Sequence, residues 1–277
     1  MATTTLFNLS VAASAEDKNS AGAVVCTVPS PGVYLLTFSA APDNRLRTNL
    51  CQALLQALDI IEFSQPPGVV ITTSAIPKFY SNGLDLDHAF NTKGYWVDSL
   101  WALYKRFLTY PMPTIALLNG HTFAGALMLA MHHDYRVFNP TRGFLCLNEL
   151  DFGASMKPPM VSIFREKIPN PAVLRSLIIE AKRFNAKDAI EGGIVDELGG
   201  LKETLDFIAQ RKLTEKGKSG CYGSLKSEMY RQSIDFLENH EREAERAEKC
   251  IEAEERRKED GLEKVRKWKR DTSNAKL

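Results

Sequence analysis

The sequence lacks cysteine pairs, long apolar runs and an excess of charge of either sign. Its cysteines include no C-x-x-C pair and form an odd, dispersed set of five: Cys26, Cys51, Cys146, Cys221 and Cys250. Such a set is typical of a reducing compartment and offers no metal site. No apolar run approaches the length of about 20 residues that spans a bilayer. The net charge of +1 over 277 residues indicates no global attraction to nucleic acid or to an anionic membrane.

Histidine is also scarce, with five residues in the chain. His132 and His133 are adjacent, so on a helix they point in different directions and make a poor shared metal site. We therefore expect no metal. A content of 44% hydrophobic and 25% charged residues is typical of a soluble globular protein.

The two ends of the chain differ from the rest. Residues 1–20 lack the basic start and long apolar core of a secretory signal, and we expect a mobile leader that holds one short strand at most. The chain ends with Ala275-Lys276-Leu277. Ser-Lys-Leu in that place is a peroxisomal address, and Ala for Ser exchanges one small residue for another. Residues 274–277 therefore suggest peroxisomal localisation and an import receptor as a partner.

Short apolar runs alternate with helical patterns from residue 21 to residue 200, the expected catalytic core. Strand-like runs are followed by helical spacing in the order 23–39 (two strands), 44–64 (helix), 68–74 (strand), 96–108 (helix), 113–120 (strand), 124–133 (helix) and 134–138 (strand). A further strand leads to Glu149, and helices follow from Pro158 onward. This alternation predicts an α/β core whose strands are covered by helices.

Residues 201–273 are expected to form a C-terminal helical region. Residues 201–213 have a helical pattern, and residues 238–270 are dominated by Glu, Lys and Arg with few apolar residues. Alternating charges can hold a helix together, and this one would be roughly 50 Å long. Because acidic and basic residues are interleaved, we expect a solvated or partner-packed helix rather than a nucleic-acid-binding one.

Two segments place glycine turns beside buried strands: FYSNGLDL (79–86) and NGHTFAGA (119–126). Glycine lets a backbone approach a ligand closely. Two such turns on neighbouring strands could direct two N–H groups at one oxygen, which is the arrangement of an oxyanion hole. From either segment alone, an ordinary connection between a strand and a helix is the more common explanation.

A third segment, LNELDFG (147–153), places Glu149 beside an apolar run. A charge in such surroundings costs free energy unless it is satisfied or used. Glu149 is therefore either a residue at a strand end that reaches for water or a catalytic base. Asp151 is a competitor, because at i+2 on an extended chain it would face the same side.

Together these segments resemble a known family. FYSNGLDL, PTIALLNGHTFAGALMLAMHHDYRV, GFLCLNELDFG and AKDAIEGGIVDEL, in this order and spacing, resemble the enoyl-CoA hydratase/isomerase (crotonase) superfamily over roughly residues 23–200. Within it they are most similar to Δ3,Δ2-enoyl-CoA isomerases of the peroxisomal type. The resemblance implies a crotonase-like superhelix of stacked ββα units with a C-terminal helical region that mediates assembly into a homotrimer or a dimer of trimers. It also implies an acyl-CoA thioester substrate and no separate cofactor, since coenzyme A is part of the substrate.

The resemblance also assigns roles to residues of the first two segments. It implies that the backbone N–H groups of Leu84 and Gly125 hold the thioester oxygen. Ser81, Asn82 and Gly83 are then expected among the substrate-binding residues. Asp85, next to them, is expected to be structural.

For coenzyme A itself the signal lies in PDNRLRTNL (residues 42–50). This segment resembles the part of the family that contacts the adenine and the phosphates of coenzyme A. Arg45 and Leu46 are therefore expected to bind the coenzyme A part of the substrate. The alternative is a helix N-terminus capped by Asp43 or Asn44.

The reaction is indicated by the residues at two positions. Hydratases of the family use two glutamates, which correspond here to Glu149 and Met128. A thioether cannot exchange protons, whereas one carboxylate suffices for a 1,3-proton shift in fatty-acid β-oxidation. We expect Met128, also a substrate-binding residue, and Leu147 to line Glu149 and raise its pKa. A hydratase or another crotonase-type acyl-CoA enzyme, and a non-catalytic acyl-CoA-binding or assembly protein, remain alternatives.

Overall fold

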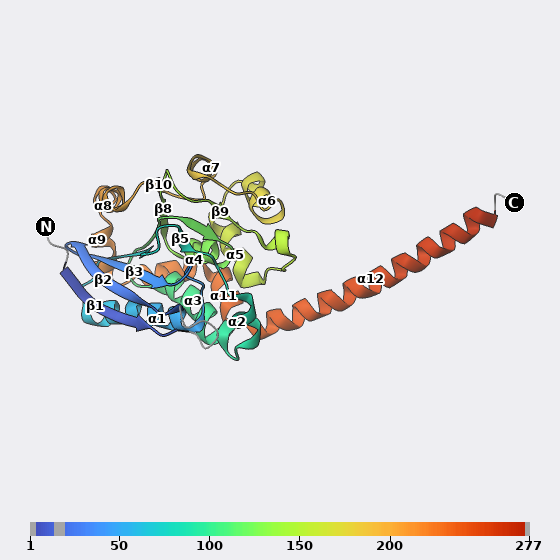
Figure 1. Ribbon diagram of the computed structural model, residues 1–277, viewed down its shortest axis with the longest axis horizontal. Coiled ribbons are helices and arrows are strands. Elements are labelled where there is room, and N and C mark those ends of the chain that lie inside the picture. Colours follow the sequence, from blue (N-terminus) through green and yellow to red (C-terminus); the bar gives the residue numbers. More distant parts are fainter. Residues whose placement is uncertain (1–3, 14–19, 275–277) are drawn as a thin grey trace. The chain divides into compact units, whose positions relative to one another are not determined.

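A computed structural model describes residues 4–13 and 20–274, and the chain forms two compact units, residues 1–237 and 238–277. The first unit contains a seven-stranded sheet with the order β1-β2-β3-β4-β6-β8-β10 (Figure 1). Its strands are β1 (Thr4–Val11), β2 (Gly22–Ser30), β3 (Val33–Ala40), β4 (Val69–Ser74), β6 (Thr114–Leu118), β8 (Tyr135–Phe138) and β10 (Glu197–Leu198). The first three strands pair antiparallel, and the pairs from β3 to β10 are parallel.

The two ends expected from the sequence lie partly outside the described residues. Within the expected leader, residues 4–11 form the eight-residue strand β1, which pairs with β2 at the edge of the large sheet. The sequence predicted at most one short strand here, and β1 is ordered because its backbone groups pair with those of β2. The Ala275-Lys276-Leu277 tail lies outside the described residues.

Both faces of the large sheet are buried at its middle strands β3, β4 and β6. Successive residues of β3 alternate between two apolar clusters: Tyr34 and Leu36 belong to one, Val33 and Leu35 to the other. This is the period of two that a strand imposes on its side chains. The helix α1 (Thr48–Ser64) packs on one face with β1, β2 and β3, while α8 (Leu201–Gln210) and α9 (Leu213–Lys216) contribute to the cluster on the other. The first unit therefore continues beyond residue 200, where the sequence suggested a boundary.

A second, three-stranded sheet was not predicted from the sequence. It has the order β5-β7-β9 and consists of β5 (Phe79–Ser81), β7 (His121–Phe123) and β9 (Leu145–Cys146), all parallel. Each of these strands follows a strand of the large sheet: β5 follows β4, β7 follows β6, and β9 follows β8. The chain thus builds successive ββ pairs that are divided between the two sheets.

Helices complete the first unit. The strand β5 is followed by α2 (Leu86–Asn91), a π-helix (Tyr95–Trp101) and α3 (Ala102–Thr109), and β7 is followed by α4 (Gly125–His132). Besides α8 and α9, the α-helices of this unit after β9 are α5 (Pro158–Lys167), α6 (Pro171–Ile179), α7 (Ala186–Glu191), α10 (Tyr222–Met229) and α11 (Arg231–Glu238). Prolines occupy the first turns of α5 and α6, where the fixed φ of proline suits the start of a helix.

The second unit contains one long helix, α12 (His240–Asn274), where the sequence predicted a charged helix. Its 35 residues correspond to about 52 Å at 1.5 Å per residue. Within the described part of the chain, no helix combines the length and the apolar composition needed to cross a membrane.

Candidate active site

The three segments singled out in the sequence meet at one edge of the second sheet. Because β5, β7 and β9 are parallel neighbours, their C-terminal ends lie side by side. Gly83 follows β5, Gly125 follows β7, and Glu149 follows β9. Residues that are far apart in the sequence are therefore gathered by three short strands, an arrangement typical of binding sites on parallel sheets.

The first two turns touch each other. A Cβ atom added to Gly83 would lie 3.1 Å from the backbone nitrogen of Gly125, and one added to Gly125 would lie 3.5 Å from the backbone nitrogen of Leu84. Among the described residues, neither of these two N–H groups donates a hydrogen bond to a protein acceptor. The site thus holds two backbone N–H groups close together, and the oxyanion hole that they were expected to form stays a prediction.

The second turn is held in a strained conformation. Ala124, just before α4, has φ 51° and ψ −125°, values that favour glycine and cost of order 1–3 kcal/mol for other residues. Its N–H donates to the carbonyl of Cys146 at 2.8 Å, and its carbonyl accepts from the N–H of Met128 at 3.1 Å. These bonds to β9 and within α4 fix the turn in place, so the N–H of Gly125 has a defined direction.

Two buried rings support this turn, and sequence reasoning missed both. The hydroxyl of Tyr104 donates to the carbonyl of Gly125 at 2.9 Å, and its ring stacks on His132 with centroids 4.2 Å apart. The Nδ1 atom of His132 lies 2.7 Å from the carbonyl of Met128, and burial lowers the pKa of His132 to about 3. A neutral imidazole therefore packs against Tyr104. In the sequence, Tyr104 is one of many apolar and aromatic residues in a helix, and no local signal distinguishes it.

Glu149 is buried in the site, with 8% of its surface exposed. Burial raises its pKa to about 7, and a hydrogen bond with its own backbone opposes this only partly. Its Oε2 atom and the neighbouring Asn148 Oδ1 are buried without a hydrogen-bond partner among the described residues. The expected desolvation and raised pKa are confirmed, whereas the role of base stays a prediction. A carboxylate with this pKa can both accept and return a proton near neutral pH.

The competing carboxylate, Asp151, does not share these surroundings. Residues Glu149–Phe152 form a 3-10 helix and not the extended chain assumed from the sequence, so i and i+2 no longer face the same side. Asp151 is exposed, and the strand before it is limited to Leu145–Cys146. Only Glu149 of this pair is desolvated.

Met128 and Leu147 are fully buried in the same apolar cluster. Met128 lies on α4, three residues after Gly125, and provides no proton-exchanging group at the position where hydratases of the family have a glutamate. Leu147 is two residues before Glu149. Their burial fits the expected apolar surroundings of Glu149, and substrate binding by Met128 stays a prediction.

Ser81 and Asn82 use their side chains within the protein. The Ser81 hydroxyl donates to the carbonyl of Asn44 at 2.6 Å, and the Asn82 amide donates to the Asp43 carboxylate at 2.6 Å. Both residues thus tie the first turn to the segment 43–46, and Gly83 completes the turn with φ 80°. The structure places these three residues at the site as expected, with positioning contacts for the two side chains.

Segment 43–46 is not the first turn of a helix, contrary to the alternative in which Asp43 or Asn44 caps one. The helix α1 begins only at Thr48, after the N-cap Arg47. Asn44 instead has φ 56°, and its buried amide donates to Ser74 Oγ at 2.6 Å and to the carbonyl of Tyr80 at 3.0 Å. These nonlocal bonds tie the segment to β4 of the large sheet and to β5 of the second sheet.

The two residues expected to bind coenzyme A differ in accessibility. Arg45 is partly exposed, and its Nη1 donates to the carbonyl of Leu84 at 2.8 Å. Leu46 is fully buried, and its N–H donates to the carbonyl of Gly83 at 2.9 Å. The side chain of Leu46 is therefore a core residue, while Arg45 connects the first glycine turn, at Leu84, with the protein surface.

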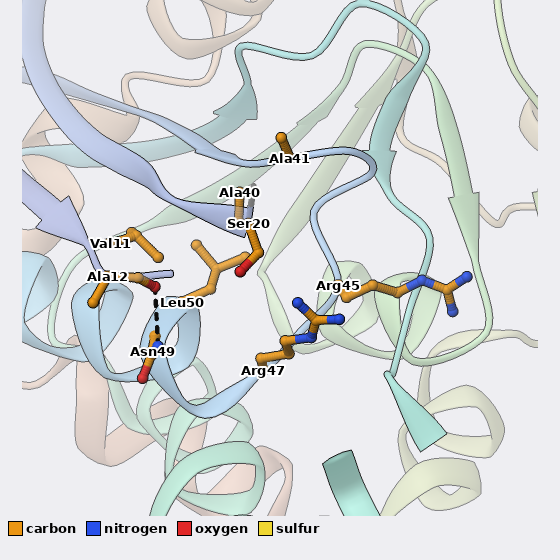
Figure 2. A pocket seen from close by; sticks show the side chains of 9 residues that line it. All are labelled: Val11, Ala12, Ser20, Ala40, Ala41, Arg45, Arg47, Asn49 and Leu50. Atoms are coloured by element: carbon orange, nitrogen blue, oxygen red, sulfur yellow. Dashed lines mark hydrogen bonds between the residues drawn. The ribbon is translucent and has the colours of Figure 1, made fainter. Parts of the chain in front are cut away.

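A small, open surface pocket is lined by Arg45 and Arg47 together with residues of β1, β3 and α1 (Figure 2). Arg45 and Arg47 extend from the segment between β3 and α1, and Asn49 at the start of α1 donates to the carbonyl of Ala12 at 3.0 Å. Arg47 also forms an ion pair of 2.6 Å with Asp85, which caps α2 as the expected structural residue. Two guanidinium groups near one pocket are suited to phosphate oxygens.

The fold and the site together define a crotonase-like protein with two backbone donors and one buried carboxylate. The chain matches the enoyl-CoA hydratase/isomerase family over residues 29–270. It is 32% identical over 221 residues to an Arabidopsis thaliana protein named enoyl-CoA delta isomerase 2, peroxisomal, and the match covers 74% of this chain and 92% of that protein. The chain therefore belongs to the enoyl-CoA hydratase/isomerase family, as its motifs indicated.

Solved structures show the same fold. A probable enoyl-CoA hydratase from Mycobacterium tuberculosis is similar with a TM-score of 0.68 and 20% identity, covering 82% of this chain and 98% of that one. The human mitochondrial delta3-delta2-enoyl-CoA isomerase has a TM-score of 0.65 and 21% identity, with coverage of 83% and 98%. The expected crotonase-like α/β fold with a C-terminal helical region is confirmed.

Proposed function

We propose that this protein is a Δ3,Δ2-enoyl-CoA isomerase, which moves a double bond of an acyl-CoA from C3 to C2. One observation carries the proposal: a single desolvated carboxylate, Glu149, lies at the same sheet edge as two backbone donors, and Met128 replaces a second carboxylate. The similarity to a relative named enoyl-CoA delta isomerase supports it.

The proposed reaction is a 1,3-proton shift. The N–H groups of Leu84 and Gly125 hold the thioester oxygen and stabilise the dienolate that forms when Glu149 removes a proton from C2. The protonated Glu149 then returns the proton at C4. A pKa of about 7 suits both steps, because the group is ready to accept a proton and ready to release it.

The coenzyme A part of the substrate is proposed to lie beside Arg45 and Arg47. Arg45 is paired with Asp43 at 3.1 Å and Arg47 with Asp85 at 2.6 Å, and the remaining N–H groups of the two guanidinium groups are proposed to donate to phosphate oxygens. Arg45 also donates to the carbonyl of Leu84. A phosphate bound to Arg45 would therefore be connected through this side chain to the turn that carries the N–H group of Leu84.

The cellular setting is proposed from the relatives of the chain. The Arabidopsis relative has a name that includes the word peroxisomal. We infer location in peroxisomes with recognition by an import receptor, a role in β-oxidation of unsaturated acyl chains, and assembly into a homotrimer or a dimer of trimers.

The central test compares two carboxylate variants. Purified protein is mixed with a trans-3-enoyl-CoA, and the absorbance of the 2-enoyl-CoA product is followed. Glu149→Gln keeps the shape of the side chain but cannot accept the proton, so turnover should fall roughly 1,000-fold. Asp151→Asn, the matched control two residues away, should keep nearly full activity. Full activity of Glu149→Gln would refute the assignment of the base.

The pH dependence gives a second test. Only the ionised form of Glu149 can take the C2 proton, so kcat/KM should rise with pH up to about 7 and level off above it. Below that pKa, activity should fall about tenfold per pH unit. A profile that levels off near pH 4.5 would show that the essential base is not a desolvated carboxyl.

Hydration is the alternative reaction to exclude. Addition of water to crotonyl-CoA requires a water molecule to be held and activated while C2 receives a proton, and the second carboxylate is missing at Met128. We therefore expect isomerisation to exceed hydration by at least about 100-fold, within the 10²–10⁴ that a positioned acid or base contributes. Comparable rates of isomerisation and of crotonyl-CoA hydration would favour the alternative that the protein is a hydratase.

A further inference from the structure

The helix α12 has an apolar seam that its own chain leaves exposed. Ile251, Val265 and Trp268 are 60%, 48% and 64% exposed, in a helix otherwise rich in charge. They belong to a heptad pattern with steps of three and four residues: Ala244, Ala247, Ile251, Glu254, Lys258, Gly261, Val265 and Trp268. Such a seam is the contact surface of a two-stranded coiled coil.

The charge of the helix is polarised along its length. Residues 240–255 contain seven acidic and three basic residues, a net charge of −4, whereas residues 256–274 contain eight basic and four acidic residues, a net charge of +4. Two copies aligned in parallel would bring like charges together. Two antiparallel copies would place each acidic half beside a basic half, so the charge pattern selects a second copy in the antiparallel orientation.

The seam residues match in one antiparallel register. With the two-fold axis at position 256, Ala244 faces Trp268, Ala247 faces Val265, Ile251 faces Gly261, and Glu254 faces Lys258 of the second copy. Each large apolar residue then meets a small one, and the central layer pairs opposite charges. The two-fold axis of this register lies at residue 256. The boundary between the acidic half and the basic half, which follows from the charges alone, lies at the same place.

Gly261 adds an independent observation. A glycine within a helix costs about 0.5–1 kcal/mol relative to alanine. A Cβ atom at Gly261 would meet no atom within 4 Å, so nothing in its own chain requires a glycine there. In the antiparallel register, the missing side chain leaves room for Ile251 of the second copy.

We infer that α12 is a self-association helix, which pairs with α12 of a second copy in an antiparallel coiled coil centred on residue 256. The pairing links two molecules through their second units and does not depend on the proposed isomerase activity. The polar layer of Glu254 and Lys258 fixes the register, as a buried polar layer does in other coiled coils.

Disulfide trapping in the full-length chain tests the register. The exposed Cys221 and Cys250 are first replaced by serine. Chains carrying Ala247→Cys are then mixed with chains carrying Val265→Cys and oxidised. The mixed dimer should form, while Ala247→Cys alone should give few dimers, because positions 247 of antiparallel partners are about 27 Å apart.

A matched pair controls for random collision. The control pair is Lys249→Cys with Glu263→Cys. Like positions 247 and 265, positions 249 and 263 are equally far from residue 256, so they lie at the same height in antiparallel partners. They differ from the seam pair in pointing away from the seam. The seam pair should give at least tenfold more mixed dimer than this control pair. Equal yields, or dimers of Ala247→Cys alone, would overturn the antiparallel pairing.

Charge reversal provides a second, independent readout. Glu248, Glu252 and Glu255 are changed to lysine in one variant, and Lys264, Lys267 and Arg270 to glutamate in another. Each variant should lose about tenfold in mixed-dimer yield, and the chain that carries both sets should regain it. Far-ultraviolet circular dichroism checks that the helix persists. Failure of the combined variant to regain the mixed dimer would contradict the inference. So would binding of the full-length chain to anionic vesicles when the Ala247→Cys and Val265→Cys chains give no mixed dimer.

Discussion

The two turns that supply the backbone donors reach similar positions by different means. Gly83 adopts φ 80° as a glycine, without steric cost from a side chain. Ala124 adopts φ 51° although it carries a methyl group, and it is held there by bonds to β9 and α4. The first turn depends on its residue type, and the second depends on its surroundings.

This difference predicts where each turn is sensitive to substitution. At Gly83, an added Cβ atom would meet backbone, whose position is fixed by the second sheet. At Gly125, it would meet the side chain of Leu84, which can rotate. Substitution in the first turn should therefore lower the free energy of unfolding of the protein. Substitution in the second turn should mainly lower kcat.

The largest effect is expected for Gly83→Ala. The new methyl group would lie 2.7 Å from the carbonyl oxygen of Phe123, in addition to the strain at positive φ. The free energy of unfolding should fall by about 3 kcal/mol or more, as measured by urea denaturation. Gly153→Ala is the control, because Gly153 has φ 72° but no atom within 4 Å of an added Cβ. Equal losses in both variants would show that the contact with Phe123 contributes nothing.

Gly125→Ala should mainly reduce turnover. The methyl group would lie 2.8 Å from Cγ of Leu84 and 3.5 Å from its backbone nitrogen, close to where the thioester oxygen would bind. Alanine keeps the backbone N–H of position 125, but its methyl group would crowd the bound oxygen and Leu84, and a donor that can no longer reach the oxygen typically reduces kcat about 100-fold or more. The measurement is steady-state kinetics with a 3-enoyl-CoA, with urea denaturation alongside. An active variant would remove Gly125 from the proposed oxyanion hole.

Tyr104→Phe tests the support of the second turn. The variant removes the hydroxyl that bonds to the carbonyl of Gly125 and keeps the ring that stacks on His132. We expect a loss of about 1 kcal/mol in stability and a fall in kcat of roughly tenfold, with KM unchanged. Tyr110→Phe removes a buried hydroxyl bonded to the carbonyl of Leu58, away from the site, and is the control. If both variants lowered kcat equally, the effect would not come from the turn.

The smallest effect is expected for Ala124→Gly. The exchange relieves strain at φ 51° but increases the entropy of the unfolded chain, so a net stabilisation of up to about 1 kcal/mol should remain. Ala126→Gly, inside α4, should instead destabilise by about 1 kcal/mol. Thermal unfolding of the two variants measures the contrast. Destabilisation of equal size in both would show that Ala124 is not strained.

Local patterns in the sequence predicted much of this arrangement. The long buried strands and α1 have clear periodicity, and Glu149 stands out because a charge follows an apolar run. The second sheet escaped prediction, since β5 and β7 have three residues and β9 has two, too few for a periodic signal. Without that sheet, the three segments could be related only through their family resemblance.

Nonlocal contacts account for the rest of what the sequence did not reveal. Asn44 looked like a helix cap, but its amide bonds to Ser74 and to the carbonyl of Tyr80, about 30 or more positions away. Tyr104 bonds to Gly125 across two helices. Such contacts depend on the tertiary fold, and nothing in the neighbouring residues specifies them.

Burying Glu149 also affects the thermodynamics of the whole molecule. Because its pKa is about 7 in the folded chain and near 4.5 in the unfolded one, the folded chain binds an extra proton between these values. The contribution of Glu149 to folding is therefore most favourable below pH 4.5 and falls as pH rises through 7, by up to about 3 kcal/mol. At the pH where the carboxylate is ready to abstract a proton, the fold carries this destabilisation. The proton that Glu149 must lose before it can act as a base is thus also one that stabilises the fold.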